Sequence, residues 1–187
     1  MTQKPYPHVS IVIPTRNRHK SLLNTLESIS KLNYPKNKTE VIVIDNGSTT
    51  AQSLDYKIQG LNIRTIKNKT NKGFAPALNQ GIHKSRGKYV FITNDDVIFD
   101  KNCLSELVKC AELNSKVAIV GGKMLFKNTR HMALPGFRVN LWLGYHPYDY
   151  KDADKIREMD VATGGCMLLS KQSLLKFGIF DEGFFFC

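Results

Sequence analysis

The chain has 187 residues, 42% hydrophobic and 23% charged, which is typical of one folded domain and excludes wholesale disorder. Its net charge of +11 is spread over short basic groups without a long arginine-rich tract, so we expect no nucleic-acid binding. The apolar runs are too short to cross a bilayer, and residues 1–8 lack a signal-peptide core, so the sequence predicts a cytoplasmic protein.

Apolar, β-branched segments alternate with helical patterns over the first 120 residues. Strands are predicted at Val9–Pro14, Glu40–Asp45, Asn62–Lys67, Tyr89–Thr93 and Val117–Val120. Helices are predicted around Leu22–Ile29, Thr50–Ile58, Phe74–Ile82 and Leu104–Ala111. This alternation predicts an α/β domain with a mostly parallel, Rossmann-like sheet flanked by helices.

The alternation of strand and helix patterns ends between Lys123 and Asp160, where aromatic residues are mixed with glycine, proline and charged residues. We expect strands or loops packed on the edge of the sheet there, followed by apolar Val161–Ser170 and a short helix at Lys171–Phe177. The four cysteines show no C-x-x-C spacing, so we interpret them as buried, reduced side chains.

Polar residues follow three of the predicted strands, in the segments Pro14–Asn17, Asp45–Ser48 and Asn94–Asp96. Ligands of open parallel sheets bind outside the carboxyl ends of the strands, so these segments should converge at one crevice. Adjacent carboxylates repel each other, which favours a cation between Asp95 and Asp96 or a raised pKa. Mg²⁺ and Mn²⁺ suit such oxygen ligands and often bridge them to phosphates. Alternatively, one of the two caps the next helix, although Asp100 is better placed for capping.

Other nucleotide and metal motifs do not fit. The segment Gly81–Lys88 has five residues between its glycines, where a P-loop has four, and Tyr89 follows where Ser or Thr is needed. No G-x-G-x-x-G follows the first strand, which argues against a nicotinamide or flavin enzyme. The histidines lack zinc-binding spacing.

The strand-end segments resemble glycosyltransferase family 2, whose members have the GT-A fold. Val9–Arg18 is similar to the family's first strand and nucleotide-pocket turn, Glu40–Thr49 to its second strand, and Asn71–Ile82 to its diphosphate-lining segment. The resemblance implies that Asp45 contacts the base, Asp95 lies near the ribose and Asp96 binds a divalent metal, Mg²⁺ or Mn²⁺. In the family's D-x-D motif, the first position is Asn94 here. The full set of implied nucleotide-sugar ligands is Pro14, Thr15, Arg16, Asn17, Asp45, Asn71, Gly73, Asn79, Asn94 and Asp95.

The C-terminal third resembles the family's acceptor side, through Thr163–Leu169 with Gly164 and Gly165, and through Phe177–Phe186. We therefore expect one GT-A domain over 1–187, with a nucleotide-sugar part at 1–122 and an incomplete acceptor part at 123–187. The family's catalytic Glu-Asp pair would fall after Cys187, so the catalytic base is unknown and the chain is expected to bind donor but transfer sugar poorly. Asp181 and Glu182 are the only carboxylates near that position.

The resemblance implies transfer of a sugar from a nucleoside diphosphate to an acceptor hydroxyl, with inversion, in the synthesis of cell-surface polysaccharide or glycolipid. The acceptor would be a saccharide or a lipid-linked sugar, and the basic charge suggests peripheral association with the inner membrane face. Two alternatives stay open: a catalytically incomplete module that binds nucleotide sugar, and a nucleotidyltransferase. The latter usually has a glycine-rich loop after the first strand, and Pro14–Arg18 contains no glycine.

Overall fold

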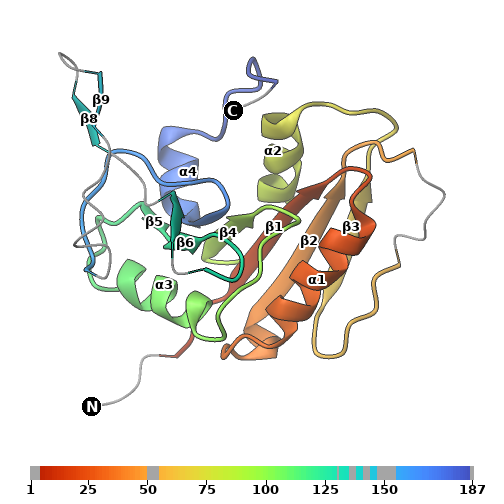
Figure 1. Cartoon of the computed structure of the whole chain (residues 1–187), viewed down its shortest axis with the longest axis horizontal. Helices are drawn as coiled ribbons and strands as arrows, with labels where there is room; N and C mark the ends of the chain where they lie inside the picture. The colour runs from red at the N-terminus through yellow and green to blue at the C-terminus, as the bar shows by residue number, and fades with distance from the viewer. Residues whose placement is uncertain are drawn as a thin grey trace.

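A computed structural model describes residues 5–49, 55–129, 131–134, 138–140, 144–146 and 155–185 of the chain. Its centre is a six-stranded sheet in the order β3-β2-β1-β4-β10-β5 (Figure 1). The strands of this sheet are β1 (Val9–Thr15), β2 (Thr39–Asp45), β3 (Ile63–Lys67), β4 (Tyr89–Thr93), β5 (Ile119–Gly121) and β10 (Cys166–Ser170).

The sheet is mostly parallel, as the alternating pattern predicts. Strand β1 pairs in parallel with β2 and β4, and β2 pairs in parallel with β3. Strand β10 is antiparallel to both of its neighbours, β4 and β5. All residues of β1 and β4 are buried, which explains why their sequences are continuous apolar runs instead of alternating ones.

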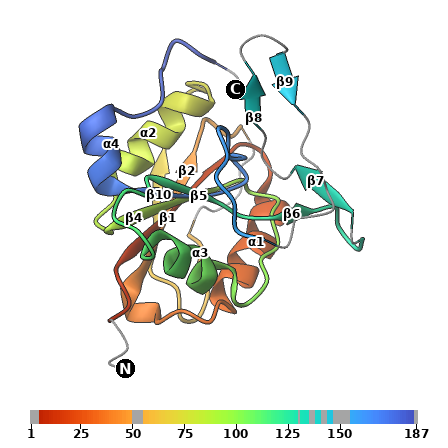
Figure 2. The same ribbon diagram turned by 90° about the vertical axis from the view of Figure 1, so that its left-hand side faces the viewer.

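Helices cover both faces of the sheet (Figure 2). Helices α1 (His19–Ser30) and α3 (Cys103–Ala111) contribute Leu22, Leu26 and Leu104 to the core on one face. On the other face, α2 (Phe74–Lys84) buries Leu78, and α4 (Lys171–Phe177) adds Leu174 at the margin. A short 3₁₀ turn, η1 (Lys36–Lys38), precedes β2. The site is therefore built on a sheet whose central strands are closed off from solvent on both faces.

Helix α2 lies unusually close to β1, because a Cβ atom on Gly81 would come within 2.3 Å of Val12 Cγ1. Pro76 sits in the first turn of the helix, where a missing N–H costs no hydrogen bond. The loop that enters α2 is consequently held close to the carboxyl end of the sheet.

Three sequence predictions need correction. Residues 55–58 are not helical, so the helix predicted at Thr50–Ile58 is wrong over this part, and 50–54 lie outside the described residues. Tyr56 is instead buried, with its ring stacked on that of His19. Asp100 does not cap α3: its Oδ1 accepts a hydrogen bond from Asn102 N, and Asn102 takes the capping position without a side-chain bond. The fifth strand begins two residues later than predicted, because its register is fixed by pairing with β10.

The three described cysteines are free thiols, but they are less uniformly buried than predicted. Cys166 is buried, whereas Cys103 and Cys110 are half-buried. The sulfur atoms of Cys103 and Cys166 lie 3.8 Å apart, between the start of α3 and β10. Cys187 lies outside the described residues.

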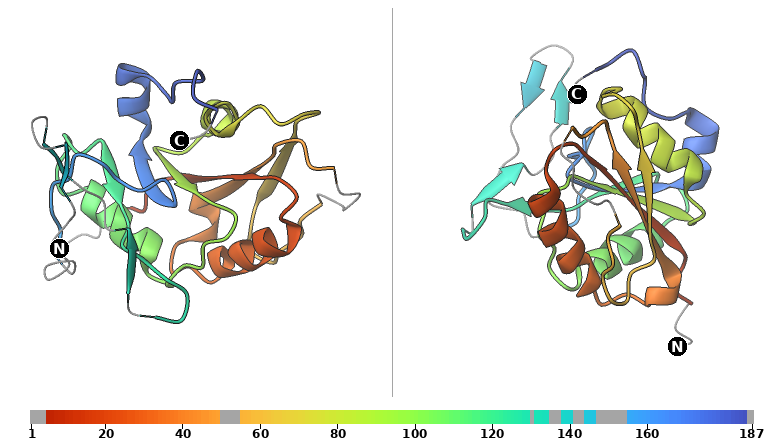
Figure 3. Two further views of the ribbon diagram at one scale, coloured as in Figure 1. Left: turned by 45° about the horizontal axis from the view of Figure 1, so that its top comes forward. Right: turned by 90° about the vertical axis from the view of Figure 1, so that its right-hand side faces the viewer.

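The irregular segment after residue 122 forms two small antiparallel sheets (Figure 3). One pairs β6 (Met124–Leu125) with β7 (Met132–Leu134), and the other pairs β8 (Arg138–Asn140) with β9 (Gly144–His146). These strands form separate sheets and do not extend the edge of the main sheet. Among the described residues, the helices are all too short or too polar to span a bilayer.

Candidate functional site

The carboxyl ends of β1, β2 and β4 converge, as the sequence predicts. Thr15 Oγ1, at the end of β1, donates a hydrogen bond of 2.6 Å to Asp95 Oδ2, just beyond β4. The backbone N–H of Asn17 donates to Ser48 Oγ at 2.9 Å, and Thr49 N donates to Asn17 Oδ1 at 2.9 Å. These contacts follow from the register, in which Thr15 is the direct partner of Asp45.

Asp45, the last residue of β2, is fully buried where these strand ends meet. Its Oδ1 accepts a hydrogen bond from Ser48 N at 2.9 Å. Its Oδ2 has no hydrogen-bond partner among the described residues, although it is shielded from solvent. A buried acceptor without a partner is costly, and native structures usually satisfy such an atom with a donor. Asp45 Oδ2 is therefore an unused hydrogen-bond acceptor at the end of β2.

Asp95 and Asp96 form the acidic side of the site, and one guanidinium contacts both. Arg18 Nη2 donates to Asp96 Oδ2 at 2.7 Å, and Arg18 Nε lies 3.3 Å from Asp95 Oδ1. Burial raises the pKa of Asp95, while the bond from Thr15 and the charge of Arg18 act in the opposite direction. The side chain of Asp96 is 45% exposed and can reach a ligand.

Arg18, which the sequence analysis did not select, contacts the acidic pair, and Arg16, which it did select, does not. Arg16 is exposed, and within the described ranges its side chain makes no hydrogen bond or ion pair. The backbone of Asn17 adopts a left-handed conformation with φ 56°, between the end of β1 and the start of α1. Asn17 lies between the two arginines, and the sequence pattern gives no signal of its left-handed backbone.

Tyr56 and His19 form a second pair that the sequence analysis missed. Their rings stack with centroids 5.3 Å apart, and Tyr56 Oη lies 3.1 Å from His19 Nδ1. Burial raises the pKa of Tyr56, and the negative charges of Asp45 and Asp95 raise it further. The phenol is therefore near enough to Asp45 and Asp95 to be affected by their charge.

Asn46 organises the loop before α2. Its Nδ2 donates to Asn71 Oδ1 at 2.8 Å and to Gly73 O at 2.9 Å. Its Oδ1 accepts from Asn68 Nδ2 and Lys72 N at 3.1 and 3.0 Å. Asn71 and Gly73 are thus brought to the strand ends, with Asn71 Oδ1 already engaged in fixing the loop.

Two further residues of the predicted site, Pro14 and Asn94, belong to the central strands or their ends. Pro14 is buried within β1, and Asn94 is half-buried at the end of β4. Beside it, the buried Gly165 accepts a hydrogen bond from Thr93 Oγ1 at 2.9 Å, while Gly164 is exposed. Gly165, one of the two glycines predicted for the acceptor side, therefore adjoins the end of β4.

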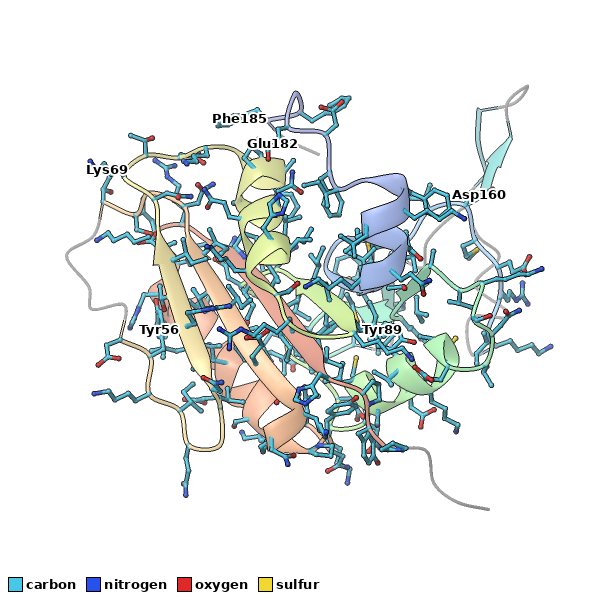
Figure 4. All side chains as sticks on the ribbon, turned by 180° about the vertical axis from the view of Figure 1, so that it is seen from behind. Tyr56, Lys69, Tyr89, Asp160, Glu182 and Phe185 are labelled. Carbon is cyan, nitrogen blue, oxygen red and sulfur yellow. The ribbon has the colours of Figure 1, made fainter. Side chains whose placement is uncertain are left out.

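Asn79 holds the C-terminal segment to α2. Its Nδ2 donates to Phe180 O at 2.8 Å and to Glu182 Oε1 at 2.9 Å, and its side chain is buried. Asp181 Oδ1 accepts from Gly183 N at 2.9 Å, which closes a local turn. Glu182 and Phe185 lie beside the start of α2 (Figure 4), where Phe185 O accepts from Phe74 N.

The carboxylates fit a divalent cation only if the ligand supplies further oxygens. Asp96 offers an exposed carboxylate, but Asp95 is already engaged by Thr15 and Arg18. The described part of the chain has no group of three or more acidic, histidine or cysteine side chains arranged to hold a metal. Mg²⁺ binds in this manner in many proteins, through one or two carboxylates together with substrate phosphates and water.

Comparison with known proteins gives consistent matches. The model of the family described as Glycosyl transferase family 2 matches residues 10–178. Glycosyltransferase GlyG of Streptococcus pneumoniae is 28% identical over 116 residues, which are 60% of this chain and 38% of that protein. Mannosyltransferase PcManGT of Pyrobaculum calidifontis, solved with GDP-Man and Mn²⁺, superposes with a TM-score of 0.72 at 20% identity, covering 96% of this chain and 49% of that one.

Staphylococcus aureus TarS, a poly(ribitol-phosphate) beta-N-acetylglucosaminyltransferase, is also similar. Its 1–349 fragment in complex with UDP superposes with a TM-score of 0.70 at 21% identity, covering 95% of this chain and 51% of that fragment. The chain thus spans about half of these two solved structures, and a smaller share of GlyG.

Proposed function

The chain belongs to glycosyl transferase family 2 and has the GT-A fold, and we propose that its strand-end site binds a nucleoside-diphosphate sugar for transfer to an acceptor hydroxyl. The observation that carries this proposal is the buried, unpaired Asp45 Oδ2 beside the Asp95–Asp96 pair. The names of PcManGT with GDP-Man and TarS with UDP support a nucleotide ligand.

Each part of the donor has a chemically suited partner in this proposal. Asp45 Oδ2 accepts a hydrogen bond from an N–H group of the base. Asp95, half of whose hydrogen-bonding capacity is taken by Thr15 and Arg18, accepts from a ribose hydroxyl. Asp96 holds Mg²⁺ or Mn²⁺, which would neutralise charge on the leaving diphosphate. Asn71 and Gly73 position the loop that borders the diphosphate.

The acceptor would approach from the side of Gly164 and Gly165, of which Gly165 adjoins Asn94. Inverting transfer needs a carboxylate that deprotonates the attacking hydroxyl. Asp181 and Glu182 stay predicted candidates for this base, and each already has a structural contact, with Gly183 N and with Asn79 respectively. We also propose an anionic or lipid-linked saccharide acceptor, which the net charge of +11 and the poly(ribitol-phosphate) acceptor in the name of TarS support.

The proposal predicts metal-dependent nucleotide binding. We expect calorimetry to give at least a tenfold lower Kd for UDP or GDP with Mn²⁺ than with EDTA, because the ion joins Asp96 to the phosphates. The corresponding nucleosides, uridine and guanosine, lack phosphates and serve as control ligands. Their Kd should be the same with Mn²⁺ and with EDTA. Asp96→Ala should abolish the metal effect without lowering the metal-free affinity. Equal affinities for the diphosphates with and without metal would remove the ion from the proposal.

A further inference from the structure

Arg18 occupies the position between the two carboxylates where a cation is expected. Its Nη2 is 2.7 Å from Asp96 Oδ2, and its Nε is 3.3 Å from Asp95 Oδ1. The side chains of Arg18 and Asp96 are both about half exposed, whereas that of Asp95 is 8% exposed. The contact with Asp96 is therefore a solvent-accessible ion pair on the open side of the site.

A guanidinium and a divalent ion compete for Asp96 Oδ2 in this arrangement. A bound Mg²⁺ lies about 2.0–2.1 Å from its oxygen ligands, and a guanidinium hydrogen-bonded to the same oxygen would be brought into direct repulsion with it. Half-exposed ion pairs are weak, so the pair can open when a better anion becomes available. The oxygens of a diphosphate are such an anion, because guanidinium groups bind phosphate with strong, two-pronged hydrogen bonds.

We propose that Arg18 is a built-in counter-ion that competes with the metal for Asp96 until the diphosphate of the donor draws it away. In the free chain, Arg18 neutralises part of the charge of Asp95 and Asp96, which keeps affinity for free metal low. When the nucleotide binds, Arg18 turns from Asp96 to a phosphate oxygen, and the released carboxylate takes the metal. Metal and nucleotide then bind cooperatively, with Arg18 as a positioning residue. This inference rests on the proposed function, since it assumes a diphosphate ligand.

The direct test is Mn²⁺ binding to the nucleotide-free chain, measured by electron paramagnetic resonance of the free ion. We expect Arg18→Gln to bind Mn²⁺ about three to ten times more tightly than the parent, because Asp96 loses its competitor. Lys20→Gln is the matched control: it removes one exposed positive charge two residues away, on α1, and should change the affinity less than twofold. Arg18→Lys keeps the positive charge but loses the planar guanidinium group. Its affinity for Mn²⁺ should lie between those of the parent and Arg18→Gln.

A second measurement follows UDP binding at saturating Mn²⁺. Arg18→Gln should weaken UDP binding about tenfold. The factor by which bound UDP raises the affinity for Mn²⁺ should fall towards one in this variant. Unchanged or weaker Mn²⁺ binding by Arg18→Gln, in a variant whose thermal unfolding matches the parent, would overturn the inference. An equal gain in Lys20→Gln would do so too, because it would reduce the effect to net charge. Metal-dependent UDP binding by the parent alongside such a result would leave the proposed function intact. Its absence in the parent would count against the proposed function and, with it, against the part of this inference that needs a diphosphate.

Discussion

Gly47→Ala is expected to destabilise the fold more than any other single methyl addition near the site. Gly47 has φ +78°, a left-handed conformation that costs an L-residue about 1–2 kcal/mol. A Cβ atom there would lie 2.4 Å from Thr70 C and 2.6 Å from Asn71 N, so backbone would have to move. Forced overpacking costs about 1–3 kcal/mol, so urea unfolding should show a total loss of about 2–5 kcal/mol.

Gly60→Ala is the matched control for this variant. Gly60 has nearly the same backbone angle, φ +80°, but the nearest atoms to an added Cβ are those of the Lys36 side chain, at 3.8 Å or more. Only the conformational cost of about 1–2 kcal/mol should therefore appear. Equal losses in the two variants would mean that the segment 70–73 does not press on Gly47. Because that segment carries Asn71, Gly47→Ala should also weaken nucleotide binding, and Gly60→Ala should not.

The parallel half of the fold could be predicted because its signals are local. Runs rich in β-branched residues, such as Val9–Thr15, are typical of strands buried on both faces, and the polar residues that follow them mark the strand ends. Once the strands are parallel and adjacent, their carboxyl ends must meet, and the 2.6 Å bond from Thr15 to Asp95 confirms this convergence.

The remainder depends on contacts between residues far apart in the sequence. Asn79, which the sequence predicts to line the diphosphate, is hydrogen-bonded in the structure to Phe180 and Glu182, which lie 101 and 103 residues later. Tyr56 reaches the site only because its ring packs on His19 from a non-helical segment. The insertion of antiparallel β10 between β4 and β5 is equally non-local. Periodicity does not encode such pairings, and Arg18 was missed for a related reason, since the sequence pattern gives no signal of the left-handed backbone at Asn17, which lies between the two arginines.

Asp45→Asn is expected to weaken binding of a nucleoside diphosphate about 10- to 100-fold, or about 1–3 kcal/mol, as the loss of a buried charged hydrogen bond predicts. Asparagine can keep the acceptor for Ser48 N but presents an NH₂ group where Asp45 has its unpaired Oδ2. The NH₂ group would point at an N–H group of the base, and two hydrogen-bond donors cannot bond to each other. The free energy of unfolding should stay constant or rise, because the substitution removes a buried charge that lacks a second partner. Calorimetry and urea unfolding measure the two quantities.

Thr25→Val is the control for Asp45→Asn, because it also removes a buried polar atom that lacks a hydrogen-bond partner. Thr25 Oγ1 is also buried without a partner among the described residues, but it lies in the middle of α1, away from the strand ends. Its replacement should leave the free energy of unfolding equal or higher and the nucleotide affinity unchanged. If Asp45→Asn behaves like Thr25→Val, with unaltered affinity, then Asp45 Oδ2 does not meet the ligand and the base lies elsewhere. If only Asp45→Asn loses affinity while both retain stability, the unpaired oxygen at the end of β2 is a ligand-binding atom, and its cost to the fold is offset when the nucleotide binds.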